Sequence, residues 1–209
     1  MNDYRNIVED VVQNVVAPNA ARVDEEAKFP RESIEALAKS GLLGLVSAKD
    51  VGGMGESPRA AAFTVMRMAQ ECGSTAMVLC MHYCGTHVIE TFGPEPVRRD
   101  IAGGKHLSTL AFSEAGSRSQ FWAPVSTASK QNGHIVLDAK KSWVTSAHHA
   151  DSYVWSSRPM KEDGASTIWF VPRNTDGVKA SGAFNGLGLR GNDSTPVVAE
   201  NARIRAEHM

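Results

Sequence analysis

The spacing of apolar residues changes near Gly104, and this change constrains the fold more than any other feature. Before it, apolar residues recur every three or four positions, as in the valines from Val8 to Val16, which is typical of amphipathic helices. After it come short runs of β-branched and aromatic residues with no helical pattern between them. The sequence therefore predicts an α+β protein, with an N-terminal all-α domain (residues 1–104) followed by an antiparallel β-barrel or sandwich domain (residues 105–209).

Start and stop residues place several of the predicted helices. Pro30 precedes the segment RESIEALAKS and Gly41 follows it, which predicts a helix between them. Ser57-Pro58 is a favourable N-cap and first-turn pair for the next helix. Ser74 is placed to cap the helix after that one.

Turn residues punctuate the second half. Asn132-Gly133 lies between two strand-like runs and is a strong signal for a β-hairpin. Asp163-Gly164 separates another pair of such runs. Both turns favour antiparallel neighbours over strands joined by crossover helices.

Composition and charge exclude several classes of protein. The chain has 22 basic and 23 acidic residues, a net charge of −1 and a pI near 6.7, which does not favour a nucleic-acid or anionic-membrane partner. No apolar run is long enough to span a bilayer, and the N-terminus lacks the apolar stretch of a signal peptide. Three cysteines argue against a disulfide framework and for a reducing compartment. We therefore expect a cytoplasmic protein.

Two groups of potential metal ligands have simpler interpretations. Cys80, Cys84 and His87 share one face of a predicted helix, but buried cysteines and helix histidines are common without a metal, so no metal site is expected. His148-His149 are adjacent, and neighbours on a strand face opposite ways, which makes chelation of one ion difficult. A loop pair, one member of which lines a cleft, is the preferred interpretation.

The glycines of NGLGLRGND resemble a nucleotide-binding loop only superficially. Gly186, Gly188 and Gly191 lack the required context, because a dinucleotide fingerprint needs a strand before it and a helix after it. Here a strand-like run follows, so the sequence predicts turn glycines.

The segment LAFSEAGSRSQFW begins as an apolar strand and breaks into small and hydroxyl-bearing residues. Ser113, Ser117 and Ser119 lie near Glu114 in it. Extended backbone offers N–H and C=O groups, and hydroxyls both donate and accept hydrogen bonds. This set suits a ligand that has an edge of alternating donors and acceptors and some negative charge.

A second candidate segment is KSWVTS. Trp143 and Thr145 are two residues apart, so on a regular strand they face the same side. An indole beside a hydroxyl suits a flat heteroaromatic ring, one packing on it and the other bonding to its edge. The alternative is that Trp143 is an ordinary core residue.

With these segments, the sequence resembles the acyl-CoA dehydrogenase family of flavoproteins. Residues 28–55 resemble its early helix and glycine-ended loop, and residues 110–119 its aromatic-x-x-Thr-Glu-Pro-x-x-Gly-Ser segment. Residues 132–154 resemble its Gly-x-Lys-x-Trp-Ile-Thr-Asn strand pair. Residues 185–204 resemble its Leu-Gly-x-Arg stretch and the strand that closes its middle domain.

The resemblance implies FAD as the cofactor and a role for each segment. The first segment would hold the flavin's pyrimidine edge, its phosphates and the start of the CoA arm, with Ser119 at the acyl-CoA substrate. The second would pack along the isoalloxazine ring. The implied cofactor-binding residues are Leu110, Ala111, Phe112, Ser113, Ser119, Trp143, Val144 and Thr145.

The sequence departs from the family pattern at several positions. Ala115 stands where proline is usual, which makes the turn less rigid. Arg118 stands where glycine is usual, so either the loop path differs or Arg118 meets a phosphate. Gln120, Ala139 and Ser146 replace aspartate, glycine and asparagine.

The family resemblance also implies an activity, which is the α,β-dehydrogenation of an acyl-CoA thioester with hydride transfer to flavin. An electron-transfer flavoprotein would accept the electrons, and the full-length protein would form a dimer or tetramer. The family's C-terminal helical bundle, which carries the catalytic glutamate, has no counterpart here. No catalytic residue is therefore assigned, and we expect an inactive fragment or a short subunit that pairs with another chain.

Three other functions remain open. A flavin-dependent monooxygenase of the same fold would need no CoA pocket, whereas a non-catalytic partner subunit would share a flavin site without turnover. A scaffold would bind neither flavin nor CoA. In every case, apolar surface that the bundle would cover predicts self-association.

Overall fold

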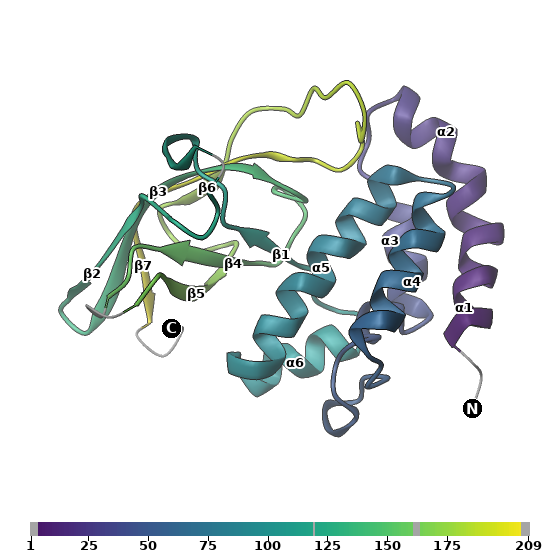
Figure 1. Ribbon diagram of the computed structural model, residues 1–209, viewed down its shortest axis with the longest axis horizontal. Helices are drawn as coiled ribbons and strands as arrows, with labels where there is room; N and C mark the ends of the chain where they lie inside the picture. Colours follow the sequence, from purple (N-terminus) through teal and green to yellow (C-terminus); the bar gives the residue numbers. More distant parts are fainter. Residues whose placement is uncertain (1–3, 119, 161–163, 206–209) are drawn as a thin grey trace.

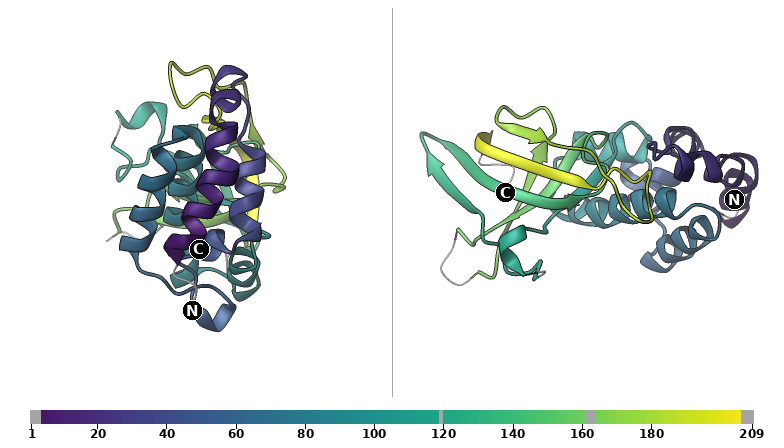
Figure 2. Two further views of the ribbon diagram at one scale, coloured as in Figure 1. Left: turned by 90° about the vertical axis from the view of Figure 1, so that its right-hand side faces the viewer. Right: turned by 90° about the horizontal axis from the view of Figure 1, so that it is seen from above.

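The structure is a computed structural model that describes residues 4–118, 120–160 and 164–205. Helices occupy the first half of the chain and strands the second, and the two sets gather at opposite ends of the molecule (Figure 1, Figure 2). The longer helical elements are α1 (Tyr4–Val11), η1 (Val12–Val16), α2 (Ala17–Glu25), α3 (Arg31–Lys39), α4 (Pro58–Ala69), α5 (Gly73–Phe92) and α6 (Glu95–Ala102). The strands are β1 (Ser108–Ala111), β2 (Thr127–Gln131), β3 (His134–Val144), β4 (Ser152–Ser157), β5 (Thr167–Pro172), β6 (Val178–Ala180) and β7 (Thr195–Arg205). Three-residue turns of 3₁₀-helix complete the list as η2 (Leu42–Gly44), η3 (Lys49–Val51) and η4 (Ala115–Ser117).

The valine stripe forms one continuous helix that widens in its middle. α1 runs into the π-helical turn η1 and then into α2, which has Pro18 in its first turn. Proline has no N–H and its ring clashes with the carbonyl four residues earlier, so a wider turn just before it relieves the clash. The Asn19 side chain donates to the Val15 carbonyl at 2.9 Å and satisfies one of the displaced backbone groups.

The predicted helix boundaries agree with the structure except at α5. α3 ends at Lys39, with Gly41 in the left-handed region, and Ser57 occupies the N-cap of α4. The assignment of Ser74 as a cap is wrong, because α5 already begins at Gly73. Its N-cap is Cys72, whose Sγ accepts from the Thr75 N–H at 3.5 Å.

The strands form two sheets, with the orders β1-β4-β5 and β2-β3-β7-β6. Their inner faces pack together in a sandwich around Trp155, Trp169 and Tyr153, all fully buried, so the sheets do not close into a barrel. The prediction of antiparallel strands holds with one correction, since β1 and β4 are parallel. They enter the sheet in the same direction because the chain between them crosses to the other sheet to form β2 and β3.

The hairpin predicted at Asn132-Gly133 joins β2 to β3. Both turn residues have positive φ, 50° and 79°, as a type I′ turn requires. The other predicted turn, Asp163-Gly164, includes a residue outside the described part of the chain. The strands on either side of it, β4 and β5, are antiparallel.

The helical and strand halves are joined through the middle of α5. The fully buried His82 accepts from the Ser108 N–H through Nδ1 at 3.1 Å, so its Nε2 carries the proton and donates to the Leu43 carbonyl at 3.0 Å. Tyr83 donates to the Leu42 carbonyl at 2.7 Å. These bonds fix the start of β1 against the helices. None of the described helices is long and apolar enough to cross a membrane.

Candidate functional site

β1 presents an open strand edge at the first candidate segment. β1 is the outer strand of its sheet, and among the described residues no strand pairs with the edge that faces away from β4. An open edge exposes backbone N–H and C=O groups in alternation. Ala111 is buried between the sheets, Leu110 and Phe112 are half-buried on the opposite face, and Ser113 is exposed.

A β-bulge shapes the second candidate segment. The pairing of β3 with β7 shifts between Lys141 and Val144, which leaves one extra residue on β3, and Trp143 adopts a φ of 54°. The side chain of Trp143 is 70% exposed, whereas Val144 and Thr145 are buried. The predicted sharing of one strand face by Trp143 and Thr145 is therefore wrong, because the bulge interrupts the regular alternation.

The structure brings the two segments together. The Ser142 N–H donates to the Ser113 carbonyl at 2.8 Å, and Glu114 and Lys141 form an isolated antiparallel bridge. The candidate residues 110–113 and 143–145 therefore lie next to a backbone hydrogen bond that joins their two segments. Ser119 lies outside the described residues.

Beneath this junction lies a buried ion pair that the sequence interpretation missed. Lys141 Nζ is 2.5 Å from Glu114 Oε1, and the side chains are 0% and 2% exposed. Burial lowers the pKa of Lys141 to about 8, although Glu114 opposes this shift. Burial raises the pKa of Glu114, but hydrogen bonds from Lys141 and Ser126 outweigh it and the net pKa is lowered. Both groups are therefore charged at neutral pH. No local sequence signal marked Lys141 as buried, because Asp138 and Lys140 in the same strand are also charged and are exposed.

The loop before β7 forms a third side of the candidate site, next to the segment after β1 and the bulge of β3. The ring of Phe184 meets Trp143 edge to face, with centroids 6.3 Å apart. Thr145 Oγ1 and Ser194 Oγ are 3.1 Å apart, and the Ser146 N–H donates to the Asn192 carbonyl at 2.9 Å. The loop thus orients Trp143 and the hydroxyl of Thr145.

The loop glycines serve turns and close packing. The loop follows β6 and leads into β7, so the helix that a dinucleotide fingerprint needs is not there. A Cβ on Gly191 would lie 2.4 Å from the Lys28 carbonyl oxygen and 2.5 Å from a methyl group of Val23. Gly191 therefore lets this loop reach the helical half.

Three of the departures from the family pattern, Ala115, Arg118 and Gln120, fall in the exposed segment after β1. Arg118 adopts a φ of 50° and is exposed, as is Gln120. Phe121 and Trp122 pack edge to face with centroids 5.0 Å apart and are 53% and 60% exposed. Ala139 lies within β3, and Ser146 is buried beneath the loop that precedes β7.

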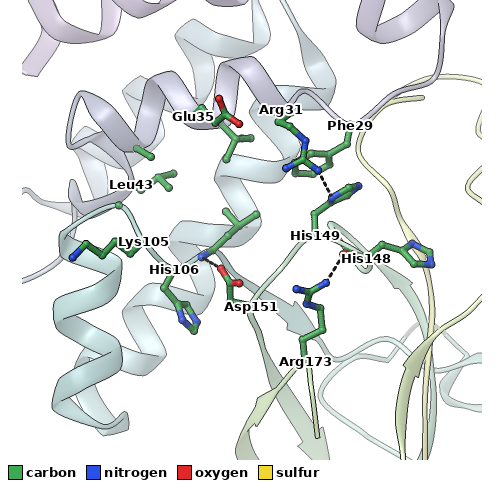
Figure 3. Close-up of a pocket in the computed structure, with 14 residues that line it drawn as sticks. Phe29, Arg31, Glu35, Leu43, Lys105, His106, His148, His149, Asp151 and Arg173 are labelled. Atoms are coloured by element: carbon green, nitrogen blue, oxygen red, sulfur yellow. Dashed lines mark hydrogen bonds between the residues drawn. The ribbon is translucent and has the colours of Figure 1, made fainter.

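The two adjacent histidines line a separate cavity of about 580 Å³ between α3 and the strands (Figure 3). Arg31 Nη2 donates to His149 Nδ1 at 3.3 Å, and Phe29 stacks on the same ring with centroids 4.0 Å apart. Arg173 donates to the His148 carbonyl at 3.0 Å. Burial and the nearby arginines lower the pKa of His149, while Asp193 opposes them, so His149 acts as a neutral acceptor. These contacts connect α3 to the strands.

Cys80 and Cys84, which are potential metal ligands by residue type, carry free thiols on α5. A hydrogen bond between the two thiols lowers the pKa of Cys80 to about 6, while the same bond raises that of Cys84. Within residues 4–118, 120–160 and 164–205, no three His, Cys, Asp or Glu side chains come together to hold a metal ion.

Both halves of this arrangement match one protein family. The pattern described as "Acyl-CoA dehydrogenase, N-terminal domain" matches residues 2–104, and "Acyl-CoA dehydrogenase, middle domain" matches residues 109–202. The chain belongs to the acyl-CoA dehydrogenase family. Members of this family are FAD-binding flavoproteins.

Individual relatives are distant but cover nearly the whole chain. An acyl-CoA dehydrogenase of Bacillus subtilis is 27% identical over 207 residues, which are 96% of this chain and 55% of that protein. The acyl-CoA dehydrogenase structure from Geobacillus kaustophilus superimposes with a TM-score of 0.87 at 17% identity, covering 98% of this chain and 56% of that one. The chain therefore spans about half the length of the relatives that it matches.

The same fold occurs with other chemistry. The methanesulfinate monooxygenase from Pseudomonas fluorescens superimposes with a TM-score of 0.85 at 19% identity, covering all of this chain and 53% of that one. At such identities the superpositions establish the fold and leave the reaction open.

Proposed function

We propose that this chain supplies the flavin-binding half of an FAD-dependent acyl-CoA dehydrogenase. The observation that carries the proposal is the junction at Ser113 and Ser142, which places an open strand edge beside an exposed indole. An isoalloxazine ring has a flat face and an edge of alternating donors and acceptors. The residues present fit such a ring.

Each group has a role in the proposed site. Leu110, Ala111, Phe112 and Ser113 offer the edge of β1 to the pyrimidine end of the ring. Trp143 packs on the ring, with Val144 and Thr145 continuing along it. When bound, FAD supplies the hydride acceptor for oxidation of the thioester substrate.

The remaining parts of the proposal concern the complete enzyme. Ser119 is the proposed contact to the acyl-CoA. No residue of this chain is proposed as the catalytic base, and the chain alone is proposed to have no turnover. An electron-transfer flavoprotein accepts the electrons, and the full-length protein is a dimer or tetramer. The proposed location is the cytoplasm, and the proposed boundary between the two domains is near residue 104.

FAD binding tests this proposal directly. Titration of FAD with the chain should give saturable quenching of flavin fluorescence, because the indole packs against the ring. Trp143→Ala should weaken binding about fivefold, since stacking of aromatic rings contributes about 1 kcal/mol. Phe92→Ala, which truncates an equally exposed aromatic at the end of α5, should leave the affinity unchanged.

The outcomes separate the candidate functions. A bound flavin whose absorption shifts on adding an acyl-CoA supports the dehydrogenase. A bound flavin whose absorption does not change on adding an acyl-CoA supports the monooxygenase. Wild-type chain that gives no saturable quenching contradicts the proposed flavin site and leaves a scaffold as the better interpretation.

A further inference from the structure

We infer that Lys141 and Glu114 are positioning residues that hold the two walls of the proposed flavin site and the loop beside it in one arrangement. This inference rests on the proposed function for its link to flavin. Glu114 follows Ser113 directly and Lys141 precedes Trp143 by two residues. The pair therefore joins the two segments at their bases.

Lys141 binds both to Glu114, which follows β1, and to β4, the central strand of the sheet that contains β1. Besides Glu114, Nζ donates to the Ser156 carbonyl at 2.7 Å and to Ser156 Oγ at 3.1 Å. All three ammonium donors thus have acceptors. Nζ also lies 5.2 Å from the centroid of the Trp155 ring. Because a buried lysine must keep such partners, the base of the bulge is fixed relative to β4.

The glutamate holds the far end of the loop. Glu114 Oε2 accepts from the Val125 N–H at 2.7 Å and from the Ser126 N–H at 2.9 Å. Its Oε1 accepts from Ser126 Oγ at 2.5 Å. One carboxylate therefore closes the chain between residues 114 and 126, a segment that carries Arg118 and Trp122.

The pair cannot be explained by stability alone. A buried ion pair contributes little compared with apolar residues of similar volume, whereas loss of one partner is strongly destabilising. Apolar side chains could fill this space, but they could not accept the Val125 and Ser126 N–H groups. Positioning of the loop is the property that requires the carboxylate, and the carboxylate requires the lysine.

Two variants distinguish positioning from stability. Lys141→Met leaves Glu114 buried without its cation, whereas the double variant Lys141→Met with Glu114→Leu exchanges the whole pair for apolar groups. We expect the double variant to recover much of the thermal midpoint that the single variant loses. Glu90→Gln, which breaks the half-buried Glu90–Arg98 pair on α5 and α6, is the matched control.

The first measurement needs no flavin. Amide hydrogen exchange, followed by NMR at a temperature where all variants are folded, should be at least tenfold faster at Val125 and Ser126 in both Lys141 variants than in Glu90→Gln. Wild-type exchange rates at these two amides in the double variant would overturn the inference. This result stands whether or not the chain binds FAD.

The second measurement adds the link to flavin. FAD affinity should fall at least tenfold in both Lys141 variants, and the visible circular dichroism of any bound flavin should change. A double variant that binds FAD as tightly as the wild type would show a structural role only. If the wild-type chain binds no flavin, the proposed function and the flavin part of this inference both fail, and the exchange data alone decide whether the pair positions the loop.

Discussion

His82 shows how one side chain makes stability depend on pH. Its imidazole is fully buried, accepts through Nδ1 and donates through Nε2, so an added proton would replace an acceptor with a donor facing the Ser108 N–H. Burial lowers its pKa from 6.5 to about 4, although the hydrogen bond to the Leu43 carbonyl opposes this shift. The folded protein therefore resists protonation of this ring.

Stability should accordingly decline in mild acid. Between pH 6.5 and about 4 the unfolded chain binds the proton that the folded chain refuses, so the free energy of unfolding falls as the pH falls. The full loss from this residue is about 3 kcal/mol, at 1.36 kcal/mol for each pKa unit. Urea unfolding at successive pH values measures it. His82→Gln should flatten this dependence, while replacement of the exposed His87 on the same helix by glutamine should not; equal slopes in all three proteins would contradict the assignment.

Single residues also set the limit of what the sequence could predict about the site. Residues 110–113 and 143–145 were singled out from the sequence as candidate flavin contacts, and that role stays a prediction. The structure adds that the two segments meet at the hydrogen bond between Ser142 and Ser113. The positive φ of Trp143 was not predictable, because tryptophan has no preference for it and only the bulge imposes it. The pairing of Lys141 with Glu114 could not be predicted either, because it depends on how two distant segments align, and one sequence does not reveal that register.

At the level of elements, the β2–β3 hairpin offers a clean measure of turn strain. Gly133 has a φ of 79°, and a Cβ built on it would meet nothing within 4 Å. Gly133→Ala should therefore destabilise the protein by about 1 kcal/mol through backbone strain alone. Gly188→Ala, also in open space but without the left-handed backbone, should be nearly neutral. Chemical denaturation compares the two; equal losses would mean that the turn is not strained by a side chain.

Helices and strands were predicted well where local residues set their ends. They were predicted less well where contacts with distant parts of the chain decide the arrangement. Caps and breakers at Pro30, Gly41 and Ser57 act through their own backbone, so the helices they bound were readable. The N-cap of α5 is the thiol of Cys72, which is a weak acceptor. From the sequence alone, Ser74 was therefore the more favourable candidate for this cap. The parallel pairing of β1 and β4 depends on where the intervening chain goes, which no local signal encodes.

For the whole molecule, exposed apolar side chains predict self-association. Phe92 is 77% exposed, Trp143 is 70% exposed and Leu187 is completely exposed, and large apolar side chains exposed in this way favour contacts between molecules. Sedimentation velocity should show a weight-average mass that rises with concentration. A variant with Phe92→Ser and Leu187→Ser should reduce this rise, whereas Met66→Ser on α4 should not. A wild-type monomer across the whole concentration range would contradict the prediction.

The parallel pairing of β1 with β4 also imposes an order of events in time. The β2–β3 hairpin needs only its own turn, so it can form within microseconds of leaving the ribosome. β1 is synthesised earlier, yet it has no sheet to join until Ser152 and its neighbours emerge, because Ser108 pairs with Ser152. During that interval the segment around Leu110 and Phe112 is an unpaired apolar strand, the kind of species that chaperones recognise in nascent chains. The edge proposed to receive the flavin is thus completed only after β4 has been synthesised, although β1 itself precedes β2 and β3 in the chain.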